Sequence, residues 1–376
     1  MAVSAAYPKL ENEYPANRID SSPSFWAALR RAEEEQELSL SEVAALLATE
    51  QPAEVQALMG VADRIRRRYV GDEVHLRGLI EFSNVCRRNC LYCGLRATNA
   101  KVRRYRMPAD EIVESAEKAY RLGFRTVVLQ SGEDPWYTVD RMCEIVRQIK
   151  SRVDVAVTLS IGERPREEYA ALKEAGADRY LLRHEAADPC LYASLHPDSV
   201  YEERLRCLHW LRELGYQIGA GSMVGLPGQT LEMLAKDVLI LRELEVDMAG
   251  IGPFIPNPDT PLGTCQRGTV EMTLKMIALA RIVTRDALIP ATTALASIDP
   301  LGREKAFQAG ANVVMPNVTP LKYREDYRIY PGKACLKDDA EHCQGCLRLR
   351  IASVGRTVGT GYGHSPRYQR LVGQRP

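Results

Sequence analysis

The sequence predicts an α/β protein whose main part is a complete (β/α)₈ barrel of the TIM type. From residue 74 onward, runs rich in β-branched residues alternate with amphipathic segments of helix length. This alternation is typical of βαβ units and a parallel sheet. Eight such runs within about 240 residues fit a closed barrel better than an open doubly wound sheet. The runs "VVLQSGEDP" and "MVGLPGQT" also lack the glycine spacing of a dinucleotide-binding sheet.

The strands are expected at residues 74–83, 126–133, 155–162, 180–186, 217–226, 248–254, 289–296 and 312–318. The helices between them are expected at residues 108–123, 138–151, 166–177, 200–215, 230–245, 269–284 and 302–311. Several of these helices end in glycine, which favours a C-terminal cap. The barrel is therefore predicted to cover residues 73–320.

Two extensions flank the predicted barrel. Residues 1–72 are expected to form an irregular arm followed by helices, two of which precede Gly71 and have Ser39 and Ser41 as candidate caps. Residues 321–376 are basic at their end and are expected to form an irregular C-terminal extension packed on the barrel.

Composition makes two classes of partner improbable. The 376 residues include 50 basic and 49 acidic side chains, so the formal net charge is +1. This balance gives no general attraction to nucleic acid or to a membrane surface. The start of the chain lacks the basic and apolar stretches of a signal peptide, and no run of about 18 apolar residues could span a bilayer. The sequence predicts a cytoplasmic protein with small-molecule partners or neutral protein partners.

The ten cysteines are unevenly spread. Four are scattered singly and are expected to be small buried hydrophobes; they are Cys143, Cys190, Cys207 and Cys265. The other six form a front triad and a rear triad, namely Cys86, Cys90 and Cys93, and Cys335, Cys343 and Cys346. Disulfides are uncommon in the cytosol, so metal binding is the better interpretation of both triads.

The front triad has the spacing C-x3-C-x2-C and follows directly on the first predicted strand. A four-iron cluster needs four outside ligands, so three thiolates leave one iron with an exchangeable position. Catalytic metal sites keep such a vacancy, whereas structural sites close it. The alternative is a zinc site with His75 or His184 as the fourth ligand.

With Tyr92 before the last cysteine and Gly94 after it, the front triad resembles the motif of the radical S-adenosylmethionine (SAM) superfamily. The resemblance implies that Cys86, Cys90 and Cys93 bind a 4Fe-4S cluster whose open iron chelates SAM. It also implies reductive cleavage of SAM to a 5′-deoxyadenosyl radical, with Tyr92 near the cofactor.

The end of the second predicted strand carries the next candidates. "QSGED" places Ser131, Gly132 and Glu133 where the superfamily holds the amino group of SAM. The pattern in the superfamily is Gly-Gly-Glu, so Ser131 departs from it but keeps a small residue there. Without the resemblance, this stretch is a strand-ending turn.

Five longer stretches together resemble the maturases of [FeFe]-hydrogenase of the HydE type, relatives of biotin synthase and methylornithine synthase. These stretches are "GLIEFSNVCRRNCLYCGLR", "VTLSIGER", "RYLLRHEAADPCLYASLHP", "GSMVGLPGQT" and "CLKDDAEHCQGC". The resemblance covers about residues 70–365. It implies SAM contacts by Ser160, Glu185 and Arg204, the last through the carboxylate, which suits a bidentate guanidinium. It also implies a substrate cavity lined by Thr158, Arg179, Arg183, Thr292 and Thr293.

The residues themselves support part of this assignment. Arg179 and Arg183 lie four positions apart on one strand, so they face the same side and could form an anion pocket. His184 and Glu185 alternate in facing, and Glu185 is the one expected to enter the barrel. Arg204 stands on a charged helix, and Thr292 and Thr293 are ordinary strand residues, so these three depend on the resemblance.

The rear triad has the spacing C-x7-C-x2-C. It matches the accessory site of some HydE-type maturases, which implies a second cluster, 2Fe-2S or 4Fe-4S, without a catalytic role. The alternative is a Cys₃His zinc site completed by His342.

The expected function is that of a radical SAM enzyme in hydrogenase maturation, acting on a small sulfur-containing iron complex. The implied partners are other hydrogenase maturases and an electron donor such as ferredoxin or flavodoxin. The alternatives are a methylornithine-synthase-like mutase, a biotin-synthase-like sulfur insertion enzyme, or a non-catalytic metal-binding scaffold.

Overall fold

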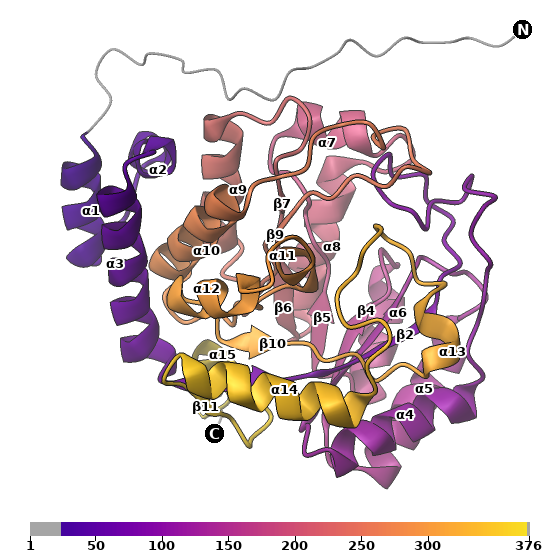
Figure 1. The fold of residues 1–376 in the computed structure, drawn as a ribbon. Helices are drawn as coiled ribbons and strands as arrows, with labels where there is room; N and C mark the ends of the chain where they lie inside the picture. The colour runs from indigo at the N-terminus through magenta and orange to yellow at the C-terminus, as the bar shows by residue number, and fades with distance from the viewer. Residues whose placement is uncertain (1–23, 374–376) are drawn as a thin grey trace, which may run out of the picture.

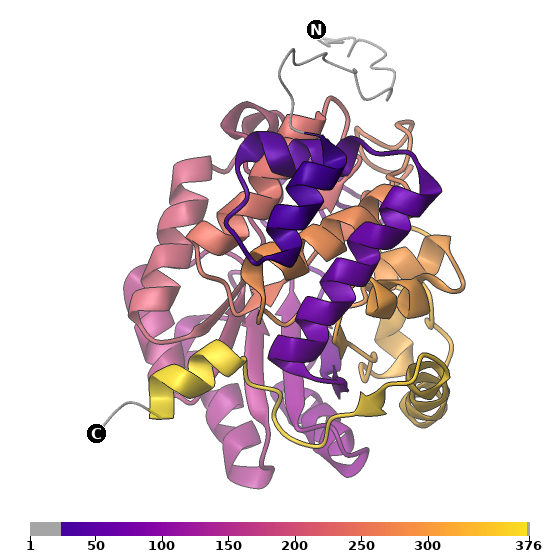
Figure 2. The same cartoon turned by 90° about the vertical axis from the view of Figure 1, so that its left-hand side faces the viewer.

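Three helices begin the part of the chain that the computed structural model describes, residues 24–373. They are α1 (Phe25–Glu33), α2 (Leu40–Ala48) and α3 (Pro52–Val70). Ser39 and Glu42 form a capping box at the start of α2, as the serine-rich sequence indicated. An irregular arm was predicted for residues 1–30. Helix α1 contradicts its last part, and residues 1–23 lie outside the described residues. The three helices cover one side of the molecule (Figure 2).

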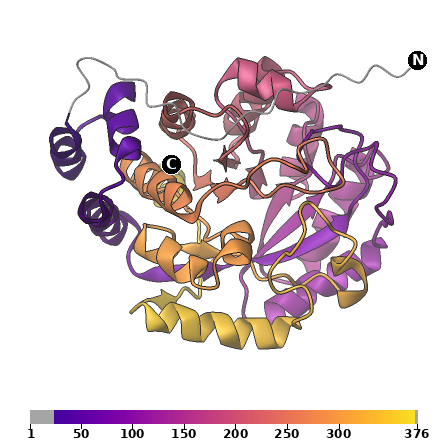
Figure 3. The same cartoon turned by 45° about the horizontal axis from the view of Figure 1, so that its top comes forward.

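Six parallel strands form the main sheet, in the order β2, β3, β4, β5, β6, β8. They are β2 (Gly78–Ser83), β3 (Thr126–Ser131), β4 (Ala156–Ser160), β5 (Arg179–Leu181), β6 (Gln217–Ala220) and β8 (Met248–Ala249). The helices that follow them in the chain are α4 (Ala109–Arg121), α5 (Val139–Arg152), α6 (Arg166–Glu174), α8 (Tyr201–Glu213), α9 (Leu231–Glu243) and α10 (Val270–Thr284). This is the predicted βα alternation. Helices surround the strands in Figures 1 and 3, and α2 and α3 pack on α9 and α10.

Isolated parallel bridges continue from β8 back toward β2. They join Met248 to Leu288, Pro290 to Val313, and Leu79 to Asn317. Strand β10 (Val313–Val314) lies within the eighth predicted strand, residues 312–318. Parallel backbone pairing therefore passes around the sheet and returns to its first strand.

The strand predicted at residues 289–296 is wrong beyond its first residues. Helix α11 (Thr293–Ile298) begins inside this range, and the Thr292 hydroxyl accepts a hydrogen bond from the Leu295 N–H as its N-cap. Threonine is a good strand residue but also a good N-cap, and the cap decides the local structure here.

The C-terminal extension is not irregular, contrary to the prediction. It contains α13 (Leu321–Arg324), α14 (Ala340–Ser353), β11 (Thr357–Val358) and α15 (Pro366–Gly373). Strand β11 pairs with β1 (Glu73–Leu76), which also pairs with β10. Helix α14 crosses below the barrel in Figure 1 and buries Ala340, Cys343, Leu347 and Ile351. The remaining elements are β7 (Met223–Val224), β9 (Gly252–Pro253), α7 (Pro189–Leu195) and α12 (Gly302–Gln308).

The extension also closes the amino-terminal end of the strands. Arg179 is fully buried at the first residue of β5, where its guanidinium donates to the carbonyl oxygens of Tyr362 and Gly363 at 2.8 and 3.0 Å. The Nδ1 atom of His364 lies 2.9 Å from Nη2 of Arg179 and 2.7 Å from Nε2 of Gln217. Arginine can only donate, so this ring nitrogen accepts and the imidazole is neutral.

We predict that this histidine makes stability depend on pH. Burial and the nearby Arg179 lower the pKa of His364 from its ordinary value of 6.5 to about 4. Between these values the unfolded chain binds a proton that the folded chain does not, so the free energy of unfolding falls as the pH is lowered. The expected slope from this group is about 1 kcal/mol per pH unit. Urea unfolding between pH 4.5 and 7 should show a shallower slope for His364→Asn, and an unchanged slope would contradict the assignment.

Candidate active site

A cavity of about 300 Å³ lies at the carboxyl ends of the parallel strands. Its walls come from the loop after β2, the ends of β3, β4 and β5, β9, helix α8, the start of α11 and residues 327–330. Twelve of the predicted site residues line it: Cys86, Cys90, Tyr92, Cys93, Ser131, Gly132, Glu133, Ser160, Arg183, Glu185, Arg204 and Thr292. The structure thus brings together residues that are widely separated in the sequence.

The front triad lies in the loop that follows β2. Its cysteines are free thiols, and the Cys86 sulfur accepts hydrogen bonds from the backbone N–H groups of Arg88 and Glu133 at 3.4 and 3.3 Å. A Cβ atom on Gly132 would lie 2.4 Å from the Val85 carbonyl oxygen, so only glycine lets the end of β3 approach this loop. Strand β3 thereby helps to shape the cysteine loop.

Burial raises the pKa of all three front thiols, that of Cys93 to about 12. Thiolates are the metal-binding form, so binding of a metal centre here releases protons. Three soft sulfur donors beside a cavity, with N–H groups donating to one of them, suit an iron-sulfur cluster. Within residues 24–373, no three His, Cys, Asp or Glu side chains form a ready-made site for a metal ion.

The two histidines considered for a zinc site have other surroundings. His184 is fully buried, and its Nδ1 atom accepts a hydrogen bond from the Gly221 N–H at 3.2 Å. Its Nε2 atom lies 3.4 Å from Oδ1 of Asp237 on α9. His75, on β1, packs against Gly359 in the C-terminal extension. Neither histidine lines the cavity that holds the front cysteines.

Four side chains of alternating charge, two buried and two half-buried, lie in a row beside the cavity, and all of them except Glu163 line it. The Arg88 guanidinium lies 2.6 Å from carboxylate oxygens of both Glu133 and Glu163, and Arg204 Nε lies 2.6 Å from Glu163. Burial alone would raise the pKa of Glu163, but Arg204 and Arg88 hold it below its ordinary value. Arg204 also donates from Nη1 to the Arg183 carbonyl oxygen at 2.6 Å. This chain of charges fixes Glu133 and Arg204 relative to each other.

Arg88 and Glu163 were missed by sequence reasoning. Glu163 follows β4 in "SIGER". A charged residue directly after a glycine at a strand end was the sequence signal that could have identified it as a site residue. A Cβ atom on Gly162 would lie 2.0 Å from the Glu133 Cγ atom, and Gly162 has φ +78°. The Glu163 N–H also donates to Glu133 Oε1 at 3.0 Å. The turn after β4 is therefore built around the Glu133 side chain.

Glu185 enters the cavity from an unusual backbone position. Its φ is +67°, in the left-handed region that non-glycine residues seldom occupy. Its Oε2 atom is 3.3 Å from Nη2 of Arg183, yet this buried oxygen accepts no hydrogen bond from the described residues. A buried carboxylate oxygen of this kind is costly unless a ligand supplies a donor. His184 points away, as the alternation of side chains predicted.

Three predicted substrate residues are not among the lining residues. Arg179 is the first residue of β5 and holds the C-terminal extension, whereas Arg183 lies beyond the end of that strand and lines the cavity. Thr158 is buried two residues before Ser160, and its hydroxyl has no hydrogen-bond partner within the described residues. Thr293 is the first residue of α11. The two arginines therefore do not form the anion pocket predicted from their spacing.

The rear triad lies beside α12 and α14. Cys335 has φ +61°, and its sulfur lies 3.7 Å from Nη1 of Arg303. A hydrogen bond with the Cys343 thiol and the charge of Arg303 lower the pKa of Cys335. Cys346 is exposed one turn further along α14. The three cysteines are thus collected on one edge of the barrel.

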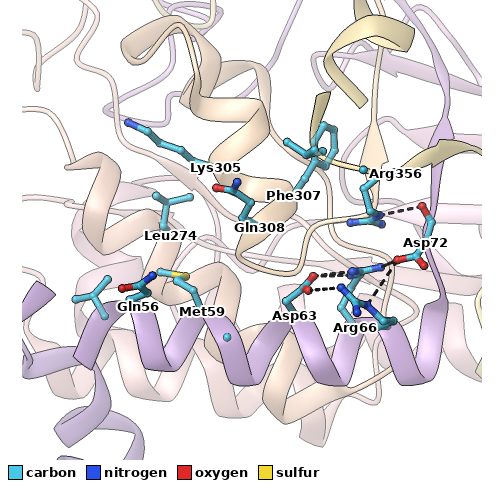
Figure 4. A pocket seen from close by; sticks show the side chains of 15 residues that line it. Gln56, Met59, Asp63, Arg66, Asp72, Leu274, Lys305, Phe307, Gln308 and Arg356 are labelled. Carbon is cyan, nitrogen blue, oxygen red and sulfur yellow. Dashed lines mark hydrogen bonds and ion pairs between the residues drawn. The ribbon is translucent and has the colours of Figure 1, made fainter. Parts of the chain in front are cut away.

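A second hollow, of about 480 Å³, lies between α3, α10, α12 and residues 354–356 (Figure 4). Its buried Arg66 side chain pairs with Asp63 and Asp72, each at 2.6 Å. Arg66 is therefore compensated within the hollow, and the hollow shares no lining residue with the cavity that holds the front cysteines.

The model of the Radical SAM superfamily matches residues 80–239. The [FeFe] hydrogenase maturase subunit HydE of Thermotoga maritima is 56% identical over 317 residues, which cover 84% of this chain and 91% of that protein. The chain belongs to the HydE family of radical SAM enzymes. Such enzymes use a 4Fe-4S cluster and SAM, so the predicted family, enzyme class and cofactors are confirmed.

Two more distant relatives are also similar to this chain. The 3-methylornithine synthase of Methanosarcina acetivorans is 31% identical over 280 residues, 74% of this chain and 79% of that protein. A solved structure of methylornithine synthase has a TM-score of 0.78 and 24% identity, and the match covers 92% of this chain and 99% of that chain. The latter likeness shows a shared α/β fold. No helix among residues 24–373 is both long and apolar enough to cross a membrane.

Gly162 provides a direct test of the site's construction. Gly123 is a matched control, because it has φ +84° but no atom within 4 Å of an added Cβ. Gly123→Ala should lower the free energy of unfolding by about 1 kcal/mol through backbone strain. Gly162→Ala should cost roughly 1–3 kcal/mol more, because its Cβ displaces Glu133. Denaturant unfolding of the two variants gives the difference, and equal losses would contradict the contact with Glu133.

Proposed function

We propose that this chain cleaves SAM in the cavity and uses the resulting radical in assembling the active site of [FeFe]-hydrogenase. The proposed substrate is a small sulfur-containing iron complex, and the proposed step contributes to the bridging dithiolate. The observation that carries this proposal is the set of three cysteines beside a cavity lined by charged groups, in a chain that spans nearly all of HydE. The cluster and SAM, when bound, supply reductive cleavage of a carbon-sulfur bond and the 5′-deoxyadenosyl radical.

The protein's own groups have distinct proposed roles. Cys86, Cys90 and Cys93 would hold the cluster, and Tyr92 would lie near the cofactor. Its hydroxyl lies 3.0 Å from His196 Nε2, which fixes the ring beside the cysteines. Burial of the ring and the charge of Glu185 raise the pKa of Tyr92, so it stays protonated.

The SAM methionine group has two candidate anchors of opposite charge. Arg204 would bind its carboxylate, because Nε and Nη1 are already fixed by Glu163 and Arg183 and the guanidinium cannot turn. The end of β3, with Ser131, Gly132 and Glu133, would hold the amino group. Ser160 and Glu185 would contact the rest of SAM, since both line the same cavity.

The substrate would lie deeper in the barrel, beside Arg183 and Thr292. Arg183 Nη2 donates to the Ser222 carbonyl oxygen at 2.5 Å and lies near Glu185. Its positive charge favours an anionic substrate. Confinement in the cavity would keep a carbon radical away from water and stray hydrogen atoms.

Four further parts of the proposal concern the whole chain. The bridges between β8 and β2 support a complete (β/α)₈ barrel. The rear triad would hold a second cluster. Partner maturases and a ferredoxin- or flavodoxin-like electron donor would act with this chain, and its location would be cytoplasmic.

The test is reductive cleavage of SAM by the reconstituted protein. With dithionite under anaerobic conditions, the protein should form 5′-deoxyadenosine, and Cys90→Ala should abolish it. Cys190→Ala is the matched control, because Cys190 is an exposed single cysteine, contrary to the expected burial. Consumption of lysine with SAM would instead favour a mutase, and no cleavage at all would favour a metal-binding scaffold.

The rear triad is predicted to bind iron without being required for SAM cleavage. Cys346→Ala removes an exposed thiol, so it should leave the packing of α14 nearly intact. Iron and sulfide per chain should fall relative to the reconstituted wild type, while 5′-deoxyadenosine formation continues. Unchanged iron content, or zinc in place of iron, would contradict a cluster there.

A further inference from the structure

Residues 326–335 form a strap across the cavity, between α13 and the first cysteine of the rear triad. The Gly94 N–H, next to Cys93, donates to the Ile329 carbonyl oxygen at 2.9 Å. Tyr327, Ile329 and Tyr330 of the strap line the cavity. Figures 1 and 3 show this segment beside the loop that follows β2. The strap therefore supplies one wall of the cavity from a part of the chain far from the barrel strands.

A buried ion pair fastens this strap to the barrel. Lys333 pairs with Glu81 on β2, and their side chains are 10% and 1% exposed. The other Glu81 oxygen accepts a hydrogen bond from Asn317 Nδ2 at 2.8 Å. Glu81 is in register with Gln130 on β3, which lines the cavity, so the Glu81 side chain enters the barrel on the same face. The Lys333 anchor therefore lies beside the cavity.

The same lysine also contacts the cavity wall. Its Nζ atom lies 5.2 Å from the centre of the Tyr327 ring. The Tyr327 hydroxyl accepts a hydrogen bond from Gln130 Nε2 at 3.3 Å. One residue after Lys333, the Ala334 N–H donates to the Ser297 hydroxyl on α11 at 2.9 Å. The strap is therefore held at both the sheet and helix α11.

The energetics favour a role in positioning over a role in overall stability. Burying two charges costs desolvation free energy, which their attraction only partly offsets. An apolar pair at the same two positions would therefore stabilise the fold as well as the ion pair does. An ion pair with a fixed partner instead selects one register of the strap, because any shift leaves Glu81 with an uncompensated buried charge. If the strap is already ordered before the ligand binds, the entropy cost of binding is lower.

We infer that Lys333 is a positioning residue of the active cavity. Its ion pair with Glu81 holds Tyr327 and Tyr330 in place as a wall against which SAM and substrate bind. This inference rests on the proposed function only in its claim that SAM is the ligand.

The test compares Lys333→Met with Lys322→Met. Lys322 is a matched control, because it pairs with Glu111 on the surface and its side chain is 61% exposed. Hydrogen exchange of residues 326–335, measured without SAM, should be faster in Lys333→Met and unchanged in Lys322→Met. If the strap is then in place only a tenth of the time, the KM for SAM in reductive cleavage should rise about tenfold. The kcat should fall less than the KM rises, and Lys333→Arg should restore most of the affinity.

A double-mutant cycle with Glu81→Gln tests the ion pair itself. Glu81→Gln leaves Lys333 without its partner, so exchange of the strap in Glu81→Gln/Lys333→Met should increase by less than the sum of the single effects. Wild-type exchange in Lys333→Met would overturn the inference, as would faster exchange with an unchanged KM for SAM. Faster exchange in a protein that fails to cleave SAM even as wild type would instead refute the proposed function, since the exchange measurement needs no activity.

Discussion

A four-iron cluster bound by three thiolates has one iron that the protein does not ligate, and the rest of this structure depends on that constraint. The loop that carries Cys86, Cys90 and Cys93 cannot by itself decide what binds to that iron. The neighbouring strand ends shape the space beside it, because Gly132 brings β3 against the loop and Glu133 donates its backbone N–H to the Cys86 sulfur. The cavity is thus formed by several elements around one short motif.

Charge is buried around this cavity in an ordered way. Glu133, Arg88, Glu163 and Arg204 alternate in sign, so each is compensated while its position is fixed. Glu185 differs, since its buried oxygen lacks a hydrogen bond and its backbone is strained. Such exceptions are most often found where a ligand completes the site. The compensated charges give the site its shape, whereas Glu185 is a group that we propose contacts the ligand.

Local signals made the cysteine loop and the Ser131–Glu133 turn predictable, because each lies at a strand end and follows a recognisable spacing. Helix α14 was also within reach of the sequence, since Ala340, Cys343, Leu347 and Ile351 recur at helical spacing after the Asp339 cap. Other features were not. The depth of Arg179 depends on the C-terminal segment that covers it, and parity along a strand reports only the face. Tyr327 and Lys333 meet the barrel through long-range contacts that no local pattern contains.

The central claim is that SAM occupies the iron that the three cysteines leave open. Electron paramagnetic resonance of the reduced, reconstituted protein tests it most directly, with SAM carrying ¹⁵N in its amino group. We expect the cluster spectrum to change when SAM is added and to show hyperfine coupling to the labelled nitrogen. A spectrum that SAM leaves unchanged, or a front triad that holds zinc alone, would contradict the account.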